Sequence, residues 1–147
     1  MAPWGASVNG TDALIASPTV IDARQGTTGC SNGVTLQGMT LRLGADLVVY
    51  ADRLSVINGL NIQSLDGKAH ELRLLVPTTT GTCTGPTTIA APNGIQAAAN
   101  INVHLVTSGR VQINGATALS AQIDAGCLTT TGAVTLTHAT LTTKDAM

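Results

Sequence analysis

The sequence predicts an all-β fold, a parallel β-solenoid or β-helix of short strands with about three strands in each coil, a coil being one full circuit of the chain. Two observations lead to this prediction. Apolar triplets alternate with short polar turns, and equivalent triplets recur at a nearly constant interval along the chain. The 147 residues are assigned to a single all-β domain, because a chain of this length holds one sizeable core.

The triplets follow one pattern: an apolar residue, any residue, then another apolar residue. This period of two is typical of a strand that buries one face. Their starts lie five to seven residues apart, which is too close for the strands of an ordinary sandwich. The triplets are Val34–Leu36, Leu41–Leu43, Leu47–Val49, Leu54–Val56 and Leu60–Ile62.

Longer spacings indicate how the triplets stack. The interval from Val34 to Leu54 and on to Leu72, or from Leu41 to Leu60, is about 20 positions and suits a three-sided coil. Two longer phrases also recur, 33–41 at 133–141 and 53–59 at 110–115. The two phrases recur in opposite order, which excludes simple tandem duplication and favours repeated local geometry.

The composition predicts a thin core. Apolar residues make up 44% of the chain, yet Phe is absent and the only aromatic residues are Trp4 and Tyr50. Ordinary globular cores use large aromatic side chains to fill the space between packed layers. A narrow solenoid does not need them, because each inward aliphatic residue packs on its equivalents in the neighbouring coils.

The turns leave a second fold open, an antiparallel β-sandwich or jelly roll. Asn-Gly is the strongest short hairpin signal, because both residues accept a positive φ. However, a hairpin at Asn58-Gly59 would place Val56 opposite Asn61 and mix apolar with polar residues on one face. Solenoid corners use the same left-handed residues. Asn-Gly occurs at Asn9, Asn32, Asn58, Asn93 and Asn114.

Two segments depart from the strand pattern. Residues 77–88 form a Thr/Gly/Pro-rich stretch, which predicts a protruding loop. Residues 94–99, after the Pro92-Asn93 start, are expected to form one or two helical turns.

The charge balance excludes some partners. Seven basic and eight acidic residues give a net charge of −1, so no basic surface is expected for nucleic acid. No apolar run approaches the roughly 20 residues that cross a bilayer, so membrane insertion is not expected. The small polar residues and three cysteines favour an extracellular or cell-surface protein whose secretory signal is not part of this sequence.

The distribution of charge favours assembly. Residues 42–73 hold eight of the fifteen charged residues, whereas residues 74–109 hold none. A protein surface without charged residues lowers solubility unless another molecule covers it. We therefore expect a homo-oligomer or filament, with another surface protein or a glycan as further partners.

Three histidines are equally spaced along the chain. They are His70, His104 and His138, and imidazoles in register would suit a transition metal. The segments between them do not keep a regular coil length, and no carboxylate shell accompanies them. We expect isolated surface histidines, no metal site and no cofactor.

The cysteines lack the spacing of a metal or redox site. Cys30, Cys83 and Cys127 stand in turn-like contexts without a Cys-x-x-Cys pair. Their odd number permits one intrachain disulfide with a free thiol, or a bond between chains. We expect at most one intrachain disulfide.

Paired carboxylates would be needed for polysaccharide cleavage. Asp46, Asp52 and Asp66 are the only close set, and each occupies a position where turns favour Asp. The prediction is therefore a non-enzymatic structural or adhesive module, with no catalytic residue.

A binding module is the alternative function. Thr135, Thr137, Thr140 and Thr142 alternate with apolar residues, a pattern similar to the threonine arrays of ice-binding proteins. The likeness is limited to two Thr-x-Thr pairs, and outward threonines are common in strands. Carbohydrate binding ordinarily uses aromatic platforms, which this chain scarcely has.

Overall fold

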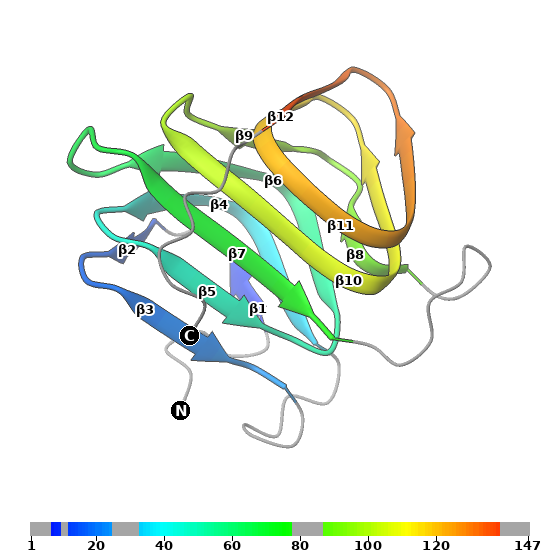
Figure 1. Cartoon of the computed structure of the whole chain (residues 1–147), viewed down its shortest axis with the longest axis horizontal. Helices are drawn as coiled ribbons and strands as arrows, with labels where there is room; N and C mark the ends of the chain where they lie inside the picture. The colour runs from blue at the N-terminus through cyan, green and yellow to red at the C-terminus, as the bar shows by residue number, and fades with distance from the viewer. Residues whose placement is uncertain (1–6, 10–11, 25–32, 78–86, 139–147) are drawn as a thin grey trace.

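The computed structural model describes residues 7–9, 12–24, 33–77 and 87–138, which form twelve strands and no helix (Figure 1). The strands are β1 (Ser7–Asn9), β2 (Ala13–Ile15), β3 (Thr19–Asp22), β4 (Val34–Leu43), β5 (Leu47–Tyr50), β6 (Leu54–Ser64), β7 (His70–Val76), β8 (Thr87–Ala91), β9 (Ile95–Ala97), β10 (Ile101–Asn114), β11 (Thr117–Thr131) and β12 (Val134–His138).

All the strand pairings in the described part of the chain are parallel. Strands β6, β9, β11, β10 and β8 pair in a closed ring, a five-stranded parallel barrel. The other strands extend this ring: β4, β1 and β2 beyond β6, then β7, β5 and β3 beyond β10, and β12 on β11. The all-β prediction is confirmed, and the described strands contradict the antiparallel alternative.

The alternation of the triplets is confirmed. In β4 and β6 the first and third residues of each triplet are buried, while the residue between them is half-buried or exposed. The side chains of the core are all aliphatic or Met, as the composition predicted. Tyr50 lies outside this core, with the Arg24 guanidinium 5.2 Å from its ring centre, and Trp4 is outside the described residues. Period-two burial therefore sets which side chains face the interior.

The register agrees with the predicted spacing at one position and differs at two. Val34 pairs with Leu54, as expected. Leu41 pairs with Ile62 rather than with Leu60, because the register shifts by one residue at Gly38. Leu72 pairs with Leu47 rather than with Leu54, because Leu54 pairs with Val34 on one side and with Ile89 on the other. A constant spacing is therefore wrong in detail.

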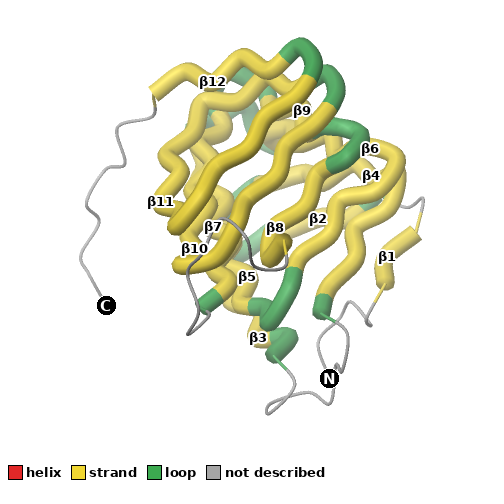
Figure 2. The backbone as a smooth tube through the Cα atoms, turned by 90° about the vertical axis from the view of Figure 1, so that its right-hand side faces the viewer, coloured by secondary structure: helices red, strands yellow, loops and turns green. Residues whose placement is uncertain are grey.

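One corner is built from glycines with positive φ. Gly38, Gly59, Gly94, Gly115 and Gly132 all have φ between +53° and +91°. Three of them follow an asparagine, and the Asn58 backbone N–H donates to the Asn93 side-chain oxygen at 3.0 Å. The bends of neighbouring strands lie side by side here (Figure 2). These Asn-Gly pairs do not form hairpins: Asn58-Gly59 lies within β6, β8 and β9 on either side of Asn93-Gly94 do not pair with each other, and β10 and β11 on either side of Asn114-Gly115 pair in parallel.

Two local predictions need correction. The helical turns expected at 94–99 are wrong, because Ile95–Ala97 form β9 and Ile95 is buried beside Leu60. Burial in a parallel sheet overrides the local helix propensity. Of the loop expected at 77–88, residues 78–86 lie outside the described residues, and Thr87 and Thr88 already belong to β8.

The two recurring phrases have different positions in the sheet. Leu54 and Val111, from the phrases at 53–59 and 110–115, both pair with Ile89 and share one column. Val34 pairs with Leu54, whereas Val134 pairs with Thr117, so the phrases at 33–41 and 133–141 do not stack. The phrases at 53–59 and 110–115 therefore occupy equivalent positions in the sheet. The phrases at 33–41 and 133–141 share only the residue pattern of a strand.

Candidate functional site

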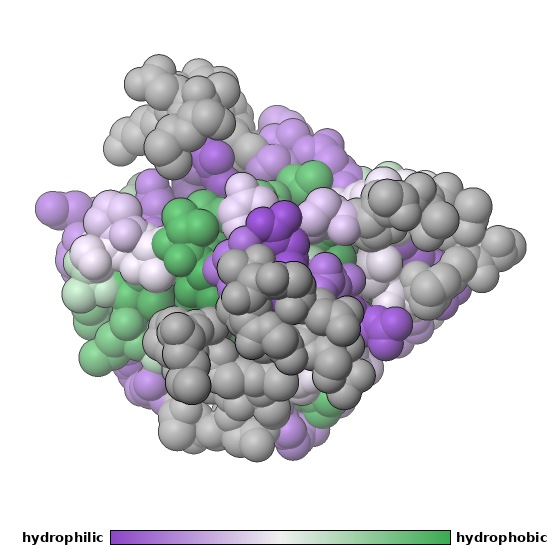
Figure 3. Space-filling model, turned by 90° about the horizontal axis from the view of Figure 1, so that it is seen from below, coloured by the Kyte–Doolittle hydropathy of each residue, from purple (hydrophilic) through white to green (hydrophobic). Residues whose placement is uncertain are grey.

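Large apolar side chains remain exposed mainly on the first and last strands of the sheet. On β2 and β3, Leu14 and Val20 keep 61% and 60% of their surface exposed. On β11 and β12, Leu128 and Leu136 keep 43% and 39%. Viewed from below, the side on which β3 lies in Figure 1, the surface carries green apolar areas between polar ones (Figure 3). Both edges of the fold therefore present apolar surface.

The C-terminal edge continues the columns of the core. Val111 is fully buried, yet its partner on the next strand, Leu128, is exposed. Leu119 is likewise buried while its partner Leu136 is exposed. No strand among the described residues pairs with the outer edge of β12. Side chains in core positions and backbone groups of a strand are thus available together at this edge.

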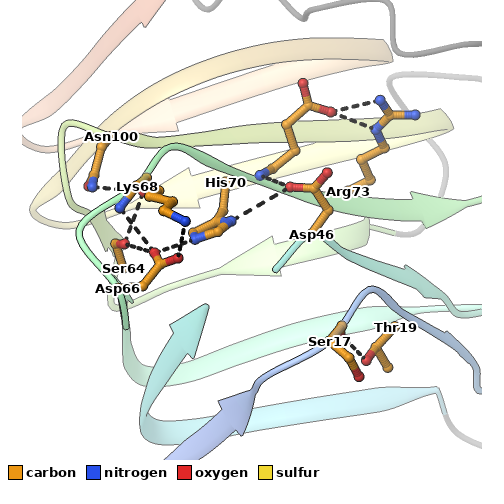
Figure 4. Close-up of polar contacts among 10 residues, drawn as sticks. Ser17, Thr19, Asp46, Ser64, Asp66, Lys68, His70, Arg73 and Asn100 are labelled. Carbon is orange, nitrogen blue, oxygen red and sulfur yellow. Dashed lines mark hydrogen bonds and ion pairs between the residues drawn. The ribbon is translucent and has the colours of Figure 1, made fainter. Parts of the chain in front are cut away.

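A polar cluster occupies the turn between β6 and β7 (Figure 4). His70 is buried, and its Nε2 lies 2.7 Å from Oδ1 of Asp66. The same carboxylate oxygen accepts the backbone N–H of Lys68 at 3.0 Å and the Ser64 hydroxyl at 3.2 Å. Hydrogen bonds from His70, the Lys68 backbone and Ser64 lower the pKa of Asp66 from 3.8 to about 2. Asn100 closes the turn by donating to the Lys68 carbonyl at 2.9 Å.

Asp46 reaches the other side of the same imidazole. Its Oδ1 lies 3.9 Å from Nδ1 of His70 and accepts the Glu71 backbone N–H at 2.9 Å. Glu71 in turn pairs with Arg73 at 2.7 Å. The structure therefore brings together two of the three acidic candidates, Asp46 and Asp66, around a histidine that the sequence did not link to them. Asp52 is not in this cluster; it interacts electrostatically with Arg24.

The cluster predicts a pH dependence of stability. A carboxyl whose pKa is lowered in the folded state stabilises the fold above its ordinary value of 3.8, and this stabilisation is lost as the pH falls towards about 2. We expect Asp66→Asn to lower the melting temperature at pH 5–7 and to make no difference near pH 2. Melting followed by circular dichroism from pH 2 to 7 measures this, and parallel profiles for the two proteins would contradict it.

The equally spaced histidines do not stack. His104 pairs with Arg73 across the sheet and its Nε2 lies 2.8 Å from Asp124, whereas His70 pairs with Ile101 and His138 with Ala121. In the described part of the chain no group of three His, Cys, Asp or Glu side chains is placed to hold a metal ion. The equal spacing of the histidines therefore has no counterpart in the geometry. The expectation of isolated surface histidines is wrong for His70, because its ring is buried and lies within hydrogen-bond distance of Asp66.

Of the cysteines, only Cys127 is described. It lies on β11, beside Arg110 of β10, and it is disulfide-bonded. Cys30 and Cys83 lie outside the described residues.

A shallow groove of about 280 Å³ lies at the glycine corner, across β4, β6 and β9. Thr40 and Asn61 pair across the sheet, as do Asn61 and Gln96, so these three side chains form one wall. Asn58 and Asn93 lie along the corner on the other side. The sequence analysis did not predict this groove. The Asn-Gly pairs at Asn58 and Asn93, which it identified only as turn signals, are part of the lining. The asparagines of these pairs therefore contribute their side-chain amides to the groove as well as their backbone to the corner.

Two threonines of the array, Thr135 and Thr137, lie among the described residues, and both are exposed on β12. Thr135 continues a row of Ala118, Gln96 and Asn61, and Thr137 is next to Ser120. The described neighbours of Thr135 and Thr137 in these rows are therefore not threonines. Thr140 and Thr142 lie outside the described residues.

No protein-family model, no curated protein and no solved structure matches this chain. Within the described residues, no helix has the length and the apolar character that crossing a bilayer requires.

Proposed function

We propose that this chain is a short parallel β-solenoid, with about three strands per coil, that serves as a secreted or cell-surface structural or adhesive module and associates with copies of itself into oligomers or filaments. The observation that supports this function best is the exposure of apolar side chains at both edges of the sheet, Leu14 and Val20 at one and Leu128 and Leu136 at the other.

The strand register supports the solenoid. Paired residues are separated by one circuit of the chain, as Val34 is from Leu54 and Thr117 from Val134. β10 pairs with β7 through its first half and with β8 through its second, with a register shift after Thr107. One long strand that turns a corner in this way contributes to two sides, and this accounts for the closed ring of five strands.

The edges of a solenoid favour self-association. Its last coil leaves strand backbone and core positions available, so it needs either a cap or a neighbour. Leu128 and Leu136 occupy such positions in the columns of Val111 and Leu119. A second copy would cover this edge as one more coil would, with an aliphatic surface for Leu128 and Leu136 and a strand edge for the backbone.

Charge does not oppose this contact. Residues 125–138 contain no Lys, Arg, Asp or Glu, so two such edges meet without repulsion between formal charges. Contacts of this kind depend on apolar burial, and screening by salt weakens them little.

The disulfide of Cys127 supports a location outside the cytosol, because disulfides persist in oxidising compartments. The acidic cluster receives a structural role in this proposal. Asp66 and Asp46 each accept a backbone N–H, and a pKa of about 2 keeps Asp66 ionised, whereas a general acid needs a raised pKa.

Leu136→Asp is expected to weaken self-association by at least about tenfold, equivalent to about 1.4 kcal/mol, because it places a charge in the contact between copies. Analytical ultracentrifugation over about a hundredfold range of protein concentration measures the effect. Repeating the series at low and high salt tests the apolar character of the contact, and we expect little change.

Leu65→Asp is the matched control. Leu65 keeps 47% of its surface exposed but lies in the turn between β6 and β7, and so on none of the edge strands β2, β3, β11 and β12. Its substitution is expected to leave association unchanged. A wild-type chain that stays monomeric at the highest concentration, or equal weakening by the two substitutions, would overturn the proposal.

A further inference from the structure

We infer that the groove at the glycine corner is a binding site for an uncharged, polyhydroxylated chain, of the class of a neutral oligosaccharide lying along the stack of strands. The site is separate from the sheet edges that serve self-association, and it adds ligand binding to the proposed function. Its polar side chains are Thr40, Asn58, Asn61, Asn93 and Gln96.

The lining favours a neutral ligand. None of the residues that line the groove carries a formal charge, and the rest of its lining consists of Met39, Leu60 and three glycines of the corner. A charged ligand would lose hydration here without gaining an opposite charge, which is costly. A neutral hydroxyl exchanges hydrogen bonds with water for hydrogen bonds with the protein at little net cost.

The polar groups are suited to hydroxyls. Amides and the threonine hydroxyl both donate and accept hydrogen bonds, as sugar hydroxyls do. Among the described residues, no hydrogen bond engages the side chains of Thr40, Asn58 or Asn61. These three side chains are therefore available to a ligand without breaking a contact within the protein.

Two further amides are oriented by the fold. Asn93 uses its Oδ1 to accept the Asn58 backbone N–H, which leaves its NH₂ group for a ligand. Gln96 uses its Nε2 to donate to the Ala116 carbonyl at 2.8 Å, which leaves its Oε1 for a ligand. A donor and an acceptor are thus held in fixed orientations, which reduces the entropy lost on binding.

The arrangement favours a chain over a single sugar. Thr40, Asn61 and Gln96 lie on three adjacent parallel strands and are in register. Neighbouring strands are about 4.8 Å apart, so a polar group recurs at that interval along the groove. A linear ligand across the strands contacts all three, whereas a monosaccharide spans only part of the row.

The test is a nuclear magnetic resonance titration of the full chain, labelled with ¹⁵N, with cellohexaose, maltohexaose and mannohexaose. Glucose and hexagalacturonate serve as the monomeric and the charged comparison. We expect at least one neutral hexamer to shift the side-chain amide signals of Asn58, Asn61, Asn93 and Gln96, with a Kd of about 1 mM. Glucose and hexagalacturonate are expected to bind at least about tenfold more weakly.

Asn61→Ala and Gln96→Ala are each expected to weaken binding of that hexamer about tenfold. Gln63→Ala is the matched control, because Gln63 lies two residues after Asn61 on the same strand and outside the groove. Backbone amide spectra of all three variants are recorded as the check that each variant is folded. The inference is overturned if no neutral hexamer shifts these signals at about 10 mM, if hexagalacturonate binds equally well, or if Gln63→Ala weakens binding as much as the groove variants.

Discussion

Leu54→Asp is expected to abolish folding, whereas Ser55→Asp is expected to leave a folded protein. Leu54 is fully buried on β6, in one column with Val34 on one side and Ile89 on the other. An aspartate there is a buried carboxylate without a partner, which costs several kcal/mol. That cost is of the order of the whole stability of a domain, about 5–15 kcal/mol.

Ser55 faces away from the core. It is half-buried, and its neighbours in the row are Thr35 and Ala90. An aspartate at this position keeps contact with water and loses only some strand propensity, about 1 kcal/mol or less.

Chemical denaturation followed by circular dichroism measures both variants. Leu54→Ala is included to separate the cavity from the charge, and it is expected to cost about 2–5 kcal/mol while still folding. Equal losses of stability at positions 54 and 55 would show that burial does not alternate along β6.

Gly94→Ala is expected to destabilise the protein far more than Gly67→Ala. Both glycines have a positive φ, +84° and +76°, so an alanine costs about 1 kcal/mol of backbone strain at either position. At Gly94 the added Cβ would also lie 2.1 Å from the carbonyl oxygen of Ala116, whereas at Gly67 it would meet nothing within 4 Å.

The clash at Gly94 involves backbone that cannot easily move. Ala116 belongs to the turn between β10 and β11, and the neighbouring Thr117 hydroxyl accepts the Ile95 backbone N–H at 3.1 Å. Relieving the clash separates these two segments of the chain and weakens that hydrogen bond. Overpacking of this kind costs about 1–3 kcal/mol beyond the strain.

The comparison of melting temperatures isolates the clash, because the strain is common to both variants. We expect Gly94→Ala to melt at least about 5 °C below Gly67→Ala. Similar melting temperatures would mean that the corner relaxes to accept a side chain, and that the close approach of Gly94 to Ala116 does not define it.

The sequence alone predicted which side chains face the interior. Alternation along a strand is a local property, since successive side chains point to opposite faces whatever the strand pairs with. The buried positions of the triplets at Val34 and Leu54 therefore follow from the sequence alone, without knowledge of the strands that pair with them. The prediction of helical turns at 94–99 is wrong, because the burial of Ile95 in the sheet stabilises a strand more than the local helix propensity stabilises a helix.

The polar sites were beyond the reach of local patterns. The meeting of Asp46, Asp66 and His70 depends on a turn that folds back on itself and on the pairing of β5 with β7. The groove depends on the alignment of Thr40, Asn61 and Gln96 across three strands. Neither set has a fixed spacing in the chain, so neither gives a motif.

The sequence by itself determined the strand period and the aliphatic core, because alternation and side-chain volume are properties of single residues and their immediate neighbours. Its Asn-Gly pairs marked positions of positive φ but did not decide between hairpins and corners. Only the tertiary structure decided which strands pair and in what register. Along the chain Leu54 is much nearer to Val34 than to Ile89, although it pairs with both. Strands joined by connections of unequal length still align, because the hydrogen bonds and the apolar contacts between parallel strands are formed across space and tolerate connections of different length.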